Sequence, residues 1–139
     1  FVGEGPQVKK FEKKVKNYFN NKNLVTLNSA TSALHLTLHL LKKPVNTIES
    51  SSNYAPQLGE WPGLKDGDEV LSCPLTCTAT NWPILSNNLN IKWVDVDPKT
   101  CNMCLDDLEK QLSEKTKVIM LVHWGGYPNN LDKIREIHI

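Results

Sequence analysis

The stretch from Val25 to Leu41, VTLNSATSALHLTLHLL, constrains the fold more than any other part of this sequence. It opens on a β-branched and apolar run at residues 24–27, which is typical of a strand. Small polar residues follow at 28–32, and leucine then recurs at helical spacing as far as Leu41. The pattern predicts a strand, a tight turn and a helix, with Asn28 or Ser29 as the N-cap.

The rest of the chain repeats this alternation. Further runs with strand or helix periodicity are predicted as a helix at 7–20, strands at 69–73, 91–96 and 116–123, and helices at 78–86, 105–113 and from Leu131 onward. The run at 116–123 is almost continuously apolar, which is typical of a strand buried on both faces of a parallel sheet. Alternating strands and helices predict an α/β fold, a three-layer α/β/α domain with a mostly parallel sheet.

One segment interrupts the alternation. Residues 44–63 are rich in Ser, Asn, Pro and Gly, a composition that predicts a surface loop or insertion. The chain starts at Phe1 and ends at Ile139 while a helical pattern is still developing. We therefore expect residues 1–139 to be one partial domain, truncated at both ends, of a longer protein.

Composition narrows the class of protein. The chain is 40% hydrophobic and 22% charged, as expected for a globular protein, and its net charge of +1 gives no indication of a nucleic-acid partner. It contains no apolar run long enough to span a bilayer and no visible signal peptide. We therefore predict a cytoplasmic protein with neither nucleic acid nor membrane as partner.

The four cysteines form two closely spaced pairs, Cys73/Cys77 and Cys101/Cys104. Such spacing is compatible with a small zinc-stabilised binding module. The first pair, however, brackets Pro74 and Leu75 after an apolar strand instead of forming a knuckle-like turn. We favour reduced thiols and predict no metal site.

Three turns are predicted to meet at one edge of the sheet. Ligands of parallel sheets bind beyond the carboxyl ends of the strands, where residues 28–32, 74–81 and 123–127 would lie. The first of these turns opens a helix, whose free N–H groups and dipole attract anions. From the residues alone, this turn is either a phosphate site or an ordinary capped helix end without a ligand.

Five segments in order carry a resemblance to a known family: GEGPQVKKFE, NSATSALHLTL, GDEVLSCPLTCTATN, KWVDVDPKTCNM and SEKTKVIMLVHWGGYPNNLDKI. They resemble the DegT/StrS-type sugar aminotransferases, pyridoxal 5'-phosphate (PLP) enzymes of the aspartate-aminotransferase fold. The segments cover nearly the whole chain apart from the Ser-rich insertion. The resemblance implies that the chain is the first half of the large PLP-binding domain.

The resemblance also implies a phosphate-binding turn. The family's S-G-T-x-A motif corresponds to residues 29–33, in which Ala30 replaces the family's glycine. The backbone N–H groups of Thr31 and Ser32, together with a hydroxyl group, would hold the cofactor phosphate. The replacement is acceptable if this position does not need a positive φ angle.

The same comparison implies residues near the cofactor ring. The family places an aromatic residue on the pyridine ring directly after a threonine, whereas here Thr76 is followed by Cys77. A thiol contact then replaces the stacking unless Trp82 substitutes for the aromatic residue. The alternative is that Cys77 packs beneath its loop. His123 either contacts substrate or cofactor or supports the site through hydrogen bonds, and we favour support.

The reactive groups of the family are not found in this chain. A transaminase needs a Schiff-base lysine and a carboxylate on the pyridine nitrogen, and the family places both later in the sequence. Lys92 and Lys117 lie at strand starts, on the opposite edge of the sheet. The resemblance thus implies that the chain contains no catalytic residue and is inactive alone.

The predicted function follows from the resemblance. We expect a fragment of a PLP-dependent aminotransferase that acts on a nucleotide-linked keto sugar, with glutamate as amino donor, in polysaccharide or secondary-metabolite biosynthesis. The complete protein would be a homodimer. Two alternatives stay open: a PLP-dependent sugar dehydratase of the same family, in which a histidine replaces the lysine, and the zinc-stabilised module.

Overall fold

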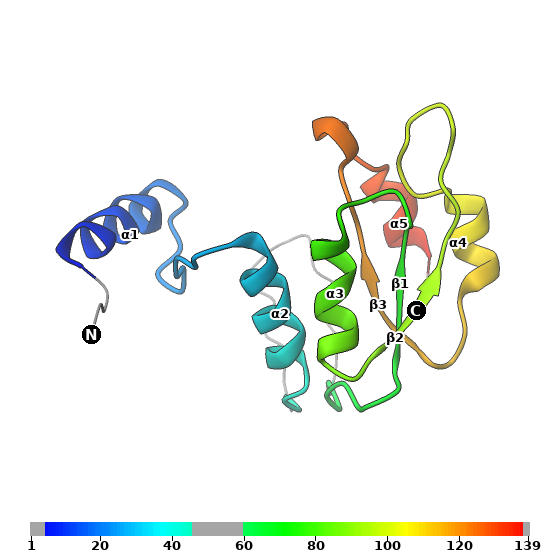
Figure 1. The fold of residues 1–139 in the computed structure, drawn as a ribbon, viewed down its shortest axis with the longest axis horizontal. Helices are drawn as coiled ribbons and strands as arrows, with labels where there is room; N and C mark the ends of the chain where they lie inside the picture. The colour runs from blue at the N-terminus through cyan, green and yellow to red at the C-terminus, as the bar shows by residue number, and fades with distance from the viewer. Residues whose placement is uncertain (1–4, 46–59, 138–139) are drawn as a thin grey trace.

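The computed structural model describes residues 5–45 and 60–137. The elements in chain order are α1 (Pro6–Tyr18), α2 (Ala30–Leu41), β1 (Glu69–Ser72), α3 (Thr78–Ser86), β2 (Asn90–Trp93), α4 (Leu105–Gln111), β3 (Thr116–Met120), the 3-10 turn η1 (Trp124–Gly126) and α5 (Leu131–Glu136). The predicted α/β class is confirmed (Figure 1).

The strands form a parallel sheet in the order β2-β1-β3 within the described residues. Successive strand residues face opposite sides of a sheet, so Val70 and Leu71 of the central strand enter different cores. Val70 packs with Leu38 of α2 and Ile84 of α3. Leu71 packs with Leu108 of α4, and α5 contributes Ile134. The sheet is therefore covered on both faces, which confirms the three-layer prediction.

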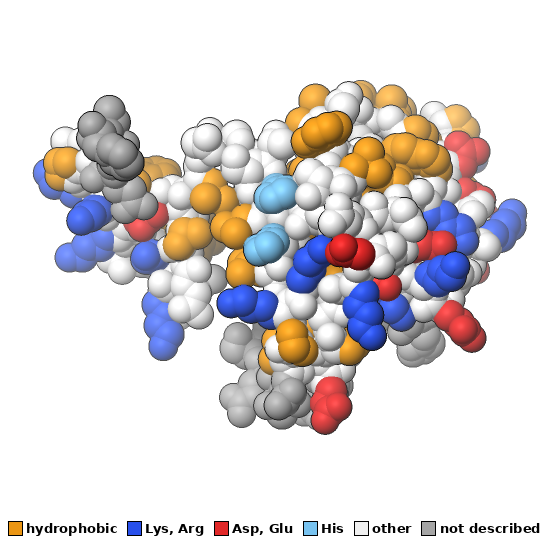
Figure 2. Space-filling view, turned by 60° about the horizontal axis from the view of Figure 1, so that its bottom comes forward, with side chains coloured by type: hydrophobic (Ala, Val, Ile, Leu, Met, Phe, Trp, Pro, Cys, Tyr) orange, Lys and Arg blue, Asp and Glu red, His pale blue; other side chains and the backbone are white. Residues whose placement is uncertain are grey.

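The N-terminal helix lies away from these layers. α1 has no buried residue, and Figure 1 shows it apart from the sheet, connected through residues 19–29. Its lysines gather at one end of the molecule, whereas acidic and basic groups are mixed over the sheet body (Figure 2). We call residues 5–29 the arm and residues 30–45 with 60–137 the body.

The predicted strand at residues 24–27 is wrong. This segment is irregular, and Val25 is 63% exposed. Instead of pairing with a strand, Thr26 donates from its backbone N–H and its hydroxyl to Glu12 of α1, each at 2.8 Å. A β-branched run favours an extended chain, but a strand also requires a neighbour that completes the ladder of hydrogen bonds.

Two other strands are shorter than predicted. β2 covers 90–93 instead of 91–96, because the chain then turns into a hairpin-like excursion closed by an antiparallel bridge between Val96 and Met103. β3 covers 116–120 instead of 116–123, and most of its residues are only half-buried. β3 lies at the edge of the described sheet. The strand buried after its first residue is therefore β1 and not the longer apolar run.

The ends of the predicted insertion at 44–63 meet each other. Val45 and Trp61 exchange two backbone hydrogen bonds of 2.8 Å, and the Trp61 indole N–H donates to the Leu41 carbonyl at 2.8 Å. The segment therefore leaves and rejoins the body at one place. Residues 46–59 lie outside the described residues, so the insertion itself stays a prediction.

Candidate functional site

The turn expected to bind phosphate forms the first turn of α2. Ser29 is the N-cap, as predicted, and its Oγ accepts the Ser32 N–H at 3.1 Å and contacts the Ser32 hydroxyl at 3.0 Å. Ala30 is the first helical residue, so it adopts an ordinary helical φ angle and glycine is not needed there. The condition for the family's glycine to be replaced by alanine is therefore met.

This helix end is suited to an anion. The first N–H groups of an α-helix lack an acceptor in the preceding turn, and here Ser29 satisfies that of Ser32. Those of Ala30 and Thr31 also belong to this first turn, among side chains small enough for a ligand to approach the backbone. The role of Thr31 and Ser32 in holding a phosphate stays a prediction.

The loop after β1 is held by a hydrogen-bonded polar pair, a buried serine and a half-buried asparagine. Ser72, the last residue of β1, is fully buried and donates to the Asn81 side-chain oxygen at 2.6 Å. The Asn81 amide reaches back to the Cys73 carbonyl at 3.4 Å, while the hydroxyls of Thr76 and Thr80 lie 2.9 Å apart. Asn81 thus fixes the loop that carries Thr76. Sequence reasoning missed it, because only the fold brings it beside the strand end.

The two cysteines of this loop have different environments. Cys77 is exposed at the N-cap of α3, so it does not pack beneath the loop. Its proposed contact with the cofactor ring stays a prediction. Trp82, the possible aromatic substitute, is 59% exposed. Cys73, by contrast, is buried, and this burial raises the pKa of its thiol.

The loop after β3 carries His123. The ring Nδ1 of His123 lies 3.1 Å from the Asn129 backbone nitrogen and 3.0 Å from the Asn129 side-chain nitrogen. Asn129 is only 6% exposed, and its side-chain nitrogen also donates to the Val122 carbonyl at 2.7 Å. The hydrogen bonds expected of His123 are present, and its role toward a ligand stays a prediction.

A second buried amide joins the loops after β2 and β3. Asn102 accepts the Trp124 N–H at 3.0 Å and donates to the Tyr127 carbonyl at 3.1 Å. Its neighbour Cys101 has a φ of +59°, an unusual conformation for a residue with a side chain. The only local signal for this role was an asparagine in a turn, which is not specific.

The predicted convergence at the carboxyl edge is present. Figure 1 shows the N-terminal ends of α2 and α3 on the same side of the molecule as the loops after β1 and β3. Lys92 and Lys117 contact Glu69 and the Glu114 carbonyl, residues at or before strand starts. Lys117 is the second residue of β3, near its start, as expected. Lys92 is the third residue of β2, so the predicted place at a strand start is wrong for it, although its ammonium group reaches back to Glu69.

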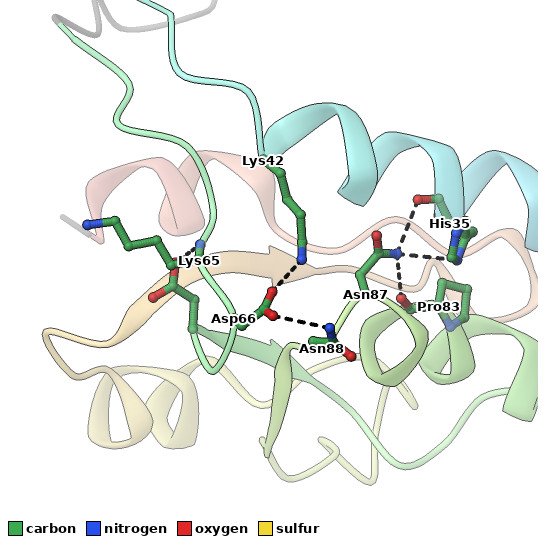
Figure 3. A network of polar contacts seen from close by, with 8 residues as sticks. His35, Lys42, Lys65, Asp66, Pro83, Asn87 and Asn88 are labelled. Carbon is green, nitrogen blue, oxygen red and sulfur yellow. Dashed lines mark hydrogen bonds and ion pairs between the residues drawn. The ribbon is translucent and has the colours of Figure 1, made fainter.

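His35 of α2 contacts α3 through hydrogen bonds, and the second histidine of this helix, His39, is exposed. The Asn87 side-chain amide contacts the ring and carbonyl of His35 and the Pro83 carbonyl, which links α2 to α3 (Figure 3). His35 Nδ1 also lies 2.8 Å from the Ser86 hydroxyl.

Residues 5–45 and 60–137 contain no cluster of three or more His, Cys, Asp or Glu side chains that could hold a metal. The same part of the chain has no helix suited to crossing a bilayer.

Taken together, the fold and the site define an α/β domain with a candidate anion site at the carboxyl edge of a parallel sheet. The model of the DegT/DnrJ/EryC1/StrS aminotransferase family matches residues 1–138, and the chain belongs to this family.

Individual relatives agree with this assignment. GDP-4-keto-6-deoxy-D-mannose 3-dehydratase of Yersinia pseudotuberculosis is 34% identical over 96% of this chain and 30% of its own length. The crystal structure of the sugar aminotransferase CalS13 from Micromonospora echinospora matches with a TM-score of 0.74 at 40% identity, covering 98% of this chain and 31% of that one. The E. coli GDP-4-keto-6-deoxy-D-mannose-3-dehydratase with bound hydrated PLP matches with a TM-score of 0.76 at 28% identity, over 97% and 31% of the two chains. The chain thus spans less than a third of the length of these relatives.

Proposed function

We propose that this chain forms the phosphate-holding part of a PLP-dependent aminotransferase that acts on a nucleotide-linked keto sugar. The observation that carries the proposal is the capped, small-residue N-terminus of α2 at the carboxyl edge, in a chain of this family. Similarity to a sugar aminotransferase and to a dehydratase that holds PLP supports the choice of cofactor and substrate class.

The donor groups of the site fit the cofactor. First-turn N–H groups and hydroxyls suit a phosphate dianion, and Ala30 leaves the backbone accessible. In the proposal, Ala30, Thr31 and Ser32 hold the phosphate, Cys77 faces the ring, and Thr76 and His123 support the site. When bound, PLP supplies an electron sink for amino-group transfer.

The proposal assigns no catalytic residue to residues 1–139. The ammonium groups of Lys92 and Lys117 contact Glu69 and the Glu114 carbonyl, away from the α2 N-terminus. We therefore infer that the reactive lysine and the pyridine-binding carboxylate come from elsewhere in the protein and that this chain is inactive alone. Glutamate as amino donor, a homodimeric complete protein and a cytoplasmic location are further parts of the proposal that rest on the family resemblance.

A sugar dehydratase of the same family is the second candidate. The 34% identity to the Yersinia dehydratase favours it, and the site described here would serve either reaction. Sequencing the gene beyond the codon for Ile139 separates the two. A lysine on a Ser-rich loop after an acidic strand end supports the aminotransferase, and a histidine in its place supports the dehydratase. If the reading frame continued with neither arrangement, both candidates would be contradicted.

The phosphate site is tested by titrating the protein with PLP and following absorbance. Proline is tolerated in the first turn of a helix, so Thr31→Pro removes one N–H and one hydroxyl while α2 can persist. Because hydrogen bonds to charged groups contribute about 1.5–3 kcal/mol, we expect binding to weaken about tenfold or more. Thr37→Ala, which removes an exposed hydroxyl bonded to the Ala33 carbonyl of the same helix, is the matched control. Equal binding by the two variants, with helix content retained, would contradict the site.

A further inference from the structure

The hydrogen bonds around His123 decide which ring nitrogen carries its proton. A backbone N–H can only donate, and that of Asn129 points at Nδ1 across 3.1 Å. Nδ1 is therefore an acceptor, and the Asn129 side-chain amide reinforces this at 3.0 Å. In a neutral imidazole the other nitrogen must then be protonated. The geometry fixes the Nε2–H tautomer, and this N–H has no acceptor among the residues that the structure describes.

Asn129 cannot turn its amide over. Its side-chain nitrogen lies 2.7 Å from the Val122 carbonyl, so a flipped amide would place two oxygens in contact. In the orientation that remains, the side-chain oxygen is buried and has no hydrogen-bond partner within the described residues. A buried acceptor without a hydrogen bond is energetically unfavourable, and such groups are rare in folded proteins. We explain the unsatisfied oxygen by the function of the amide nitrogen, which holds the His123 ring and the Val122 carbonyl in place.

The locked ring lies beside the candidate cofactor site. Ser72 of β1 is paired with Met120 of β3, so the loops that continue from these strands emerge next to each other at the carboxyl edge. One of these loops carries Thr76 and Cys77, and the other carries His123. His123 is exposed. On one side of it Asn129 donates to the Val122 carbonyl, and on the other Asn102 accepts the Trp124 N–H.

We propose that Asn129 locks His123 as a fixed Nε2–H hydrogen-bond donor, and that an acceptor oxygen of bound PLP receives this bond. The choice of PLP as the ligand rests on the proposed function, whereas the tautomer of His123 follows from the hydrogen bonds alone. A neutral ring locked in this way already carries its proton on Nε2. His123 therefore orients the ligand and does not act as a general base. Asn129 is a positioning residue that acts through His123.

The tautomer is measured by nitrogen-15 NMR of the histidine side chains in the 139-residue protein. We expect the neutral His123 ring to show a protonated Nε2 and an unprotonated Nδ1 that accepts a hydrogen bond. His39, an exposed histidine on α2, serves as the internal reference and is assigned with a His39→Gln variant. A neutral His123 ring with its proton on Nδ1 would overturn the proposal, whatever the ligand.

The donor role is tested with two variants that each keep one half of the ring's hydrogen bonding. His123→Gln retains an N–H donor near the position of Nε2, whereas His123→Asn retains an acceptor near Nδ1 and loses the distal donor. We expect the glutamine variant to bind PLP within about twofold of the wild type and the asparagine variant to bind about tenfold more weakly, the size of one hydrogen bond to a charged group.

The outcomes separate this inference from the proposed function. A wild-type protein that does not bind PLP contradicts the proposed function and removes PLP as the ligand of His123. A wild type that binds, with glutamine and asparagine variants equal to each other, overturns the donor role of His123 alone. Dispersed amide spectra of both variants verify that each is folded.

Discussion

Helices with apolar residues at helical spacing occur in both the arm and the body, but those residues are buried only in the body. α1 has 13 residues with apolar positions spaced by three and four, yet none is buried. Phe11 is 57% exposed, and Phe19, the C-cap of the helix, is 65% exposed. α4 has only 7 residues, and its Leu108 is fully buried. Apolar periodicity gives a helix one apolar face, but that face is buried only where another part of the molecule packs against it.

Polar contacts attach α1 to residues 19–29, the segment that connects it to the body. Glu12 accepts both hydrogen bonds of Thr26 and forms an ion pair with Lys16 at 3.5 Å, while Tyr18 and Phe19 contact each other edge to face. A lack of buried apolar contacts is a feature of regions that open at low free energy. The arm should therefore respond to substitution and pH independently of the body.

The largest expected effect tests the core of the body. Leu71→Ala removes a fully buried side chain from β1, and we expect the free energy of unfolding to fall by about 2–5 kcal/mol. Phe11→Ala in the arm removes a larger side chain that is 57% exposed, so its effect should be much smaller. Urea unfolding followed by circular dichroism compares them. Equal losses would mean that the arm is packed as tightly as the body.

The next effect concerns the point where the ends of residues 45–61 meet. Gly63 has a φ of +80°, and a Cβ built there would lie 2.4 Å from the Lys42 carbonyl oxygen. Gly126 has a similar φ of +83° but open space around it. Backbone strain of about 1–3 kcal/mol is common to both alanine variants, so the extra loss in Gly63→Ala measures the close approach alone. Thermal unfolding of both variants provides the comparison, and a loss no larger at Gly63 would disprove the tight closure.

A smaller effect concerns the helix that links the arm to the body. Ser29→Ala removes the N-cap of α2, and we expect a loss of about 1 kcal/mol. Amide hydrogen exchange should quicken first at Ser32, whose N–H loses its acceptor. The Thr37→Ala variant again serves as the control within the same helix. Unchanged exchange at Ser32 would show that Ser29 does not cap the helix in solution.

The smallest effect is a pH dependence that differs between the two regions. Hydrogen bonds from Thr26 lower the pKa of Glu12 in the arm, and the hydrogen bond from the Asp95 N–H lowers the pKa of Asp107 in the body. A carboxyl group with a lowered pKa stabilises the fold above its ordinary pKa, and this contribution is lost as the pH falls through the lowered value.

Both contributions are therefore present at neutral pH and lost in acid. Glu12→Gln should remove the acid sensitivity of exchange at the Thr26 amide, while the unfolding midpoint of the body stays unchanged. Asp107→Asn should instead reduce the fall of the body's unfolding midpoint as the pH is lowered into the acid range. The same response from both variants would show that arm and body unfold as one unit.

The sequence by itself determined what depends on neighbours along the chain. Apolar spacing predicted α1, α2 and α5, and the small polar residues before Leu34 predicted a cap at Asn28 or Ser29, of which Ser29 is the one observed. The order of elements predicted a parallel sheet with its loops at one edge, and the family segments predicted the fold. These features follow from local backbone preferences and from the short, regular connections of α/β proteins.

Tertiary structure decided what depends on a partner far along the chain. Residues 24–27 resemble a strand but have no strand neighbour, and the run at 116–123 is more apolar than β1 yet lies at the edge of the described sheet. The roles of Asn81, Asn102 and Asn129 also appeared only in the fold. Each is a polar residue in a turn or helix when only the sequence is known. In the fold, a strand end or a loop lies beside its amide, and hydrogen bonds to those groups fix its orientation.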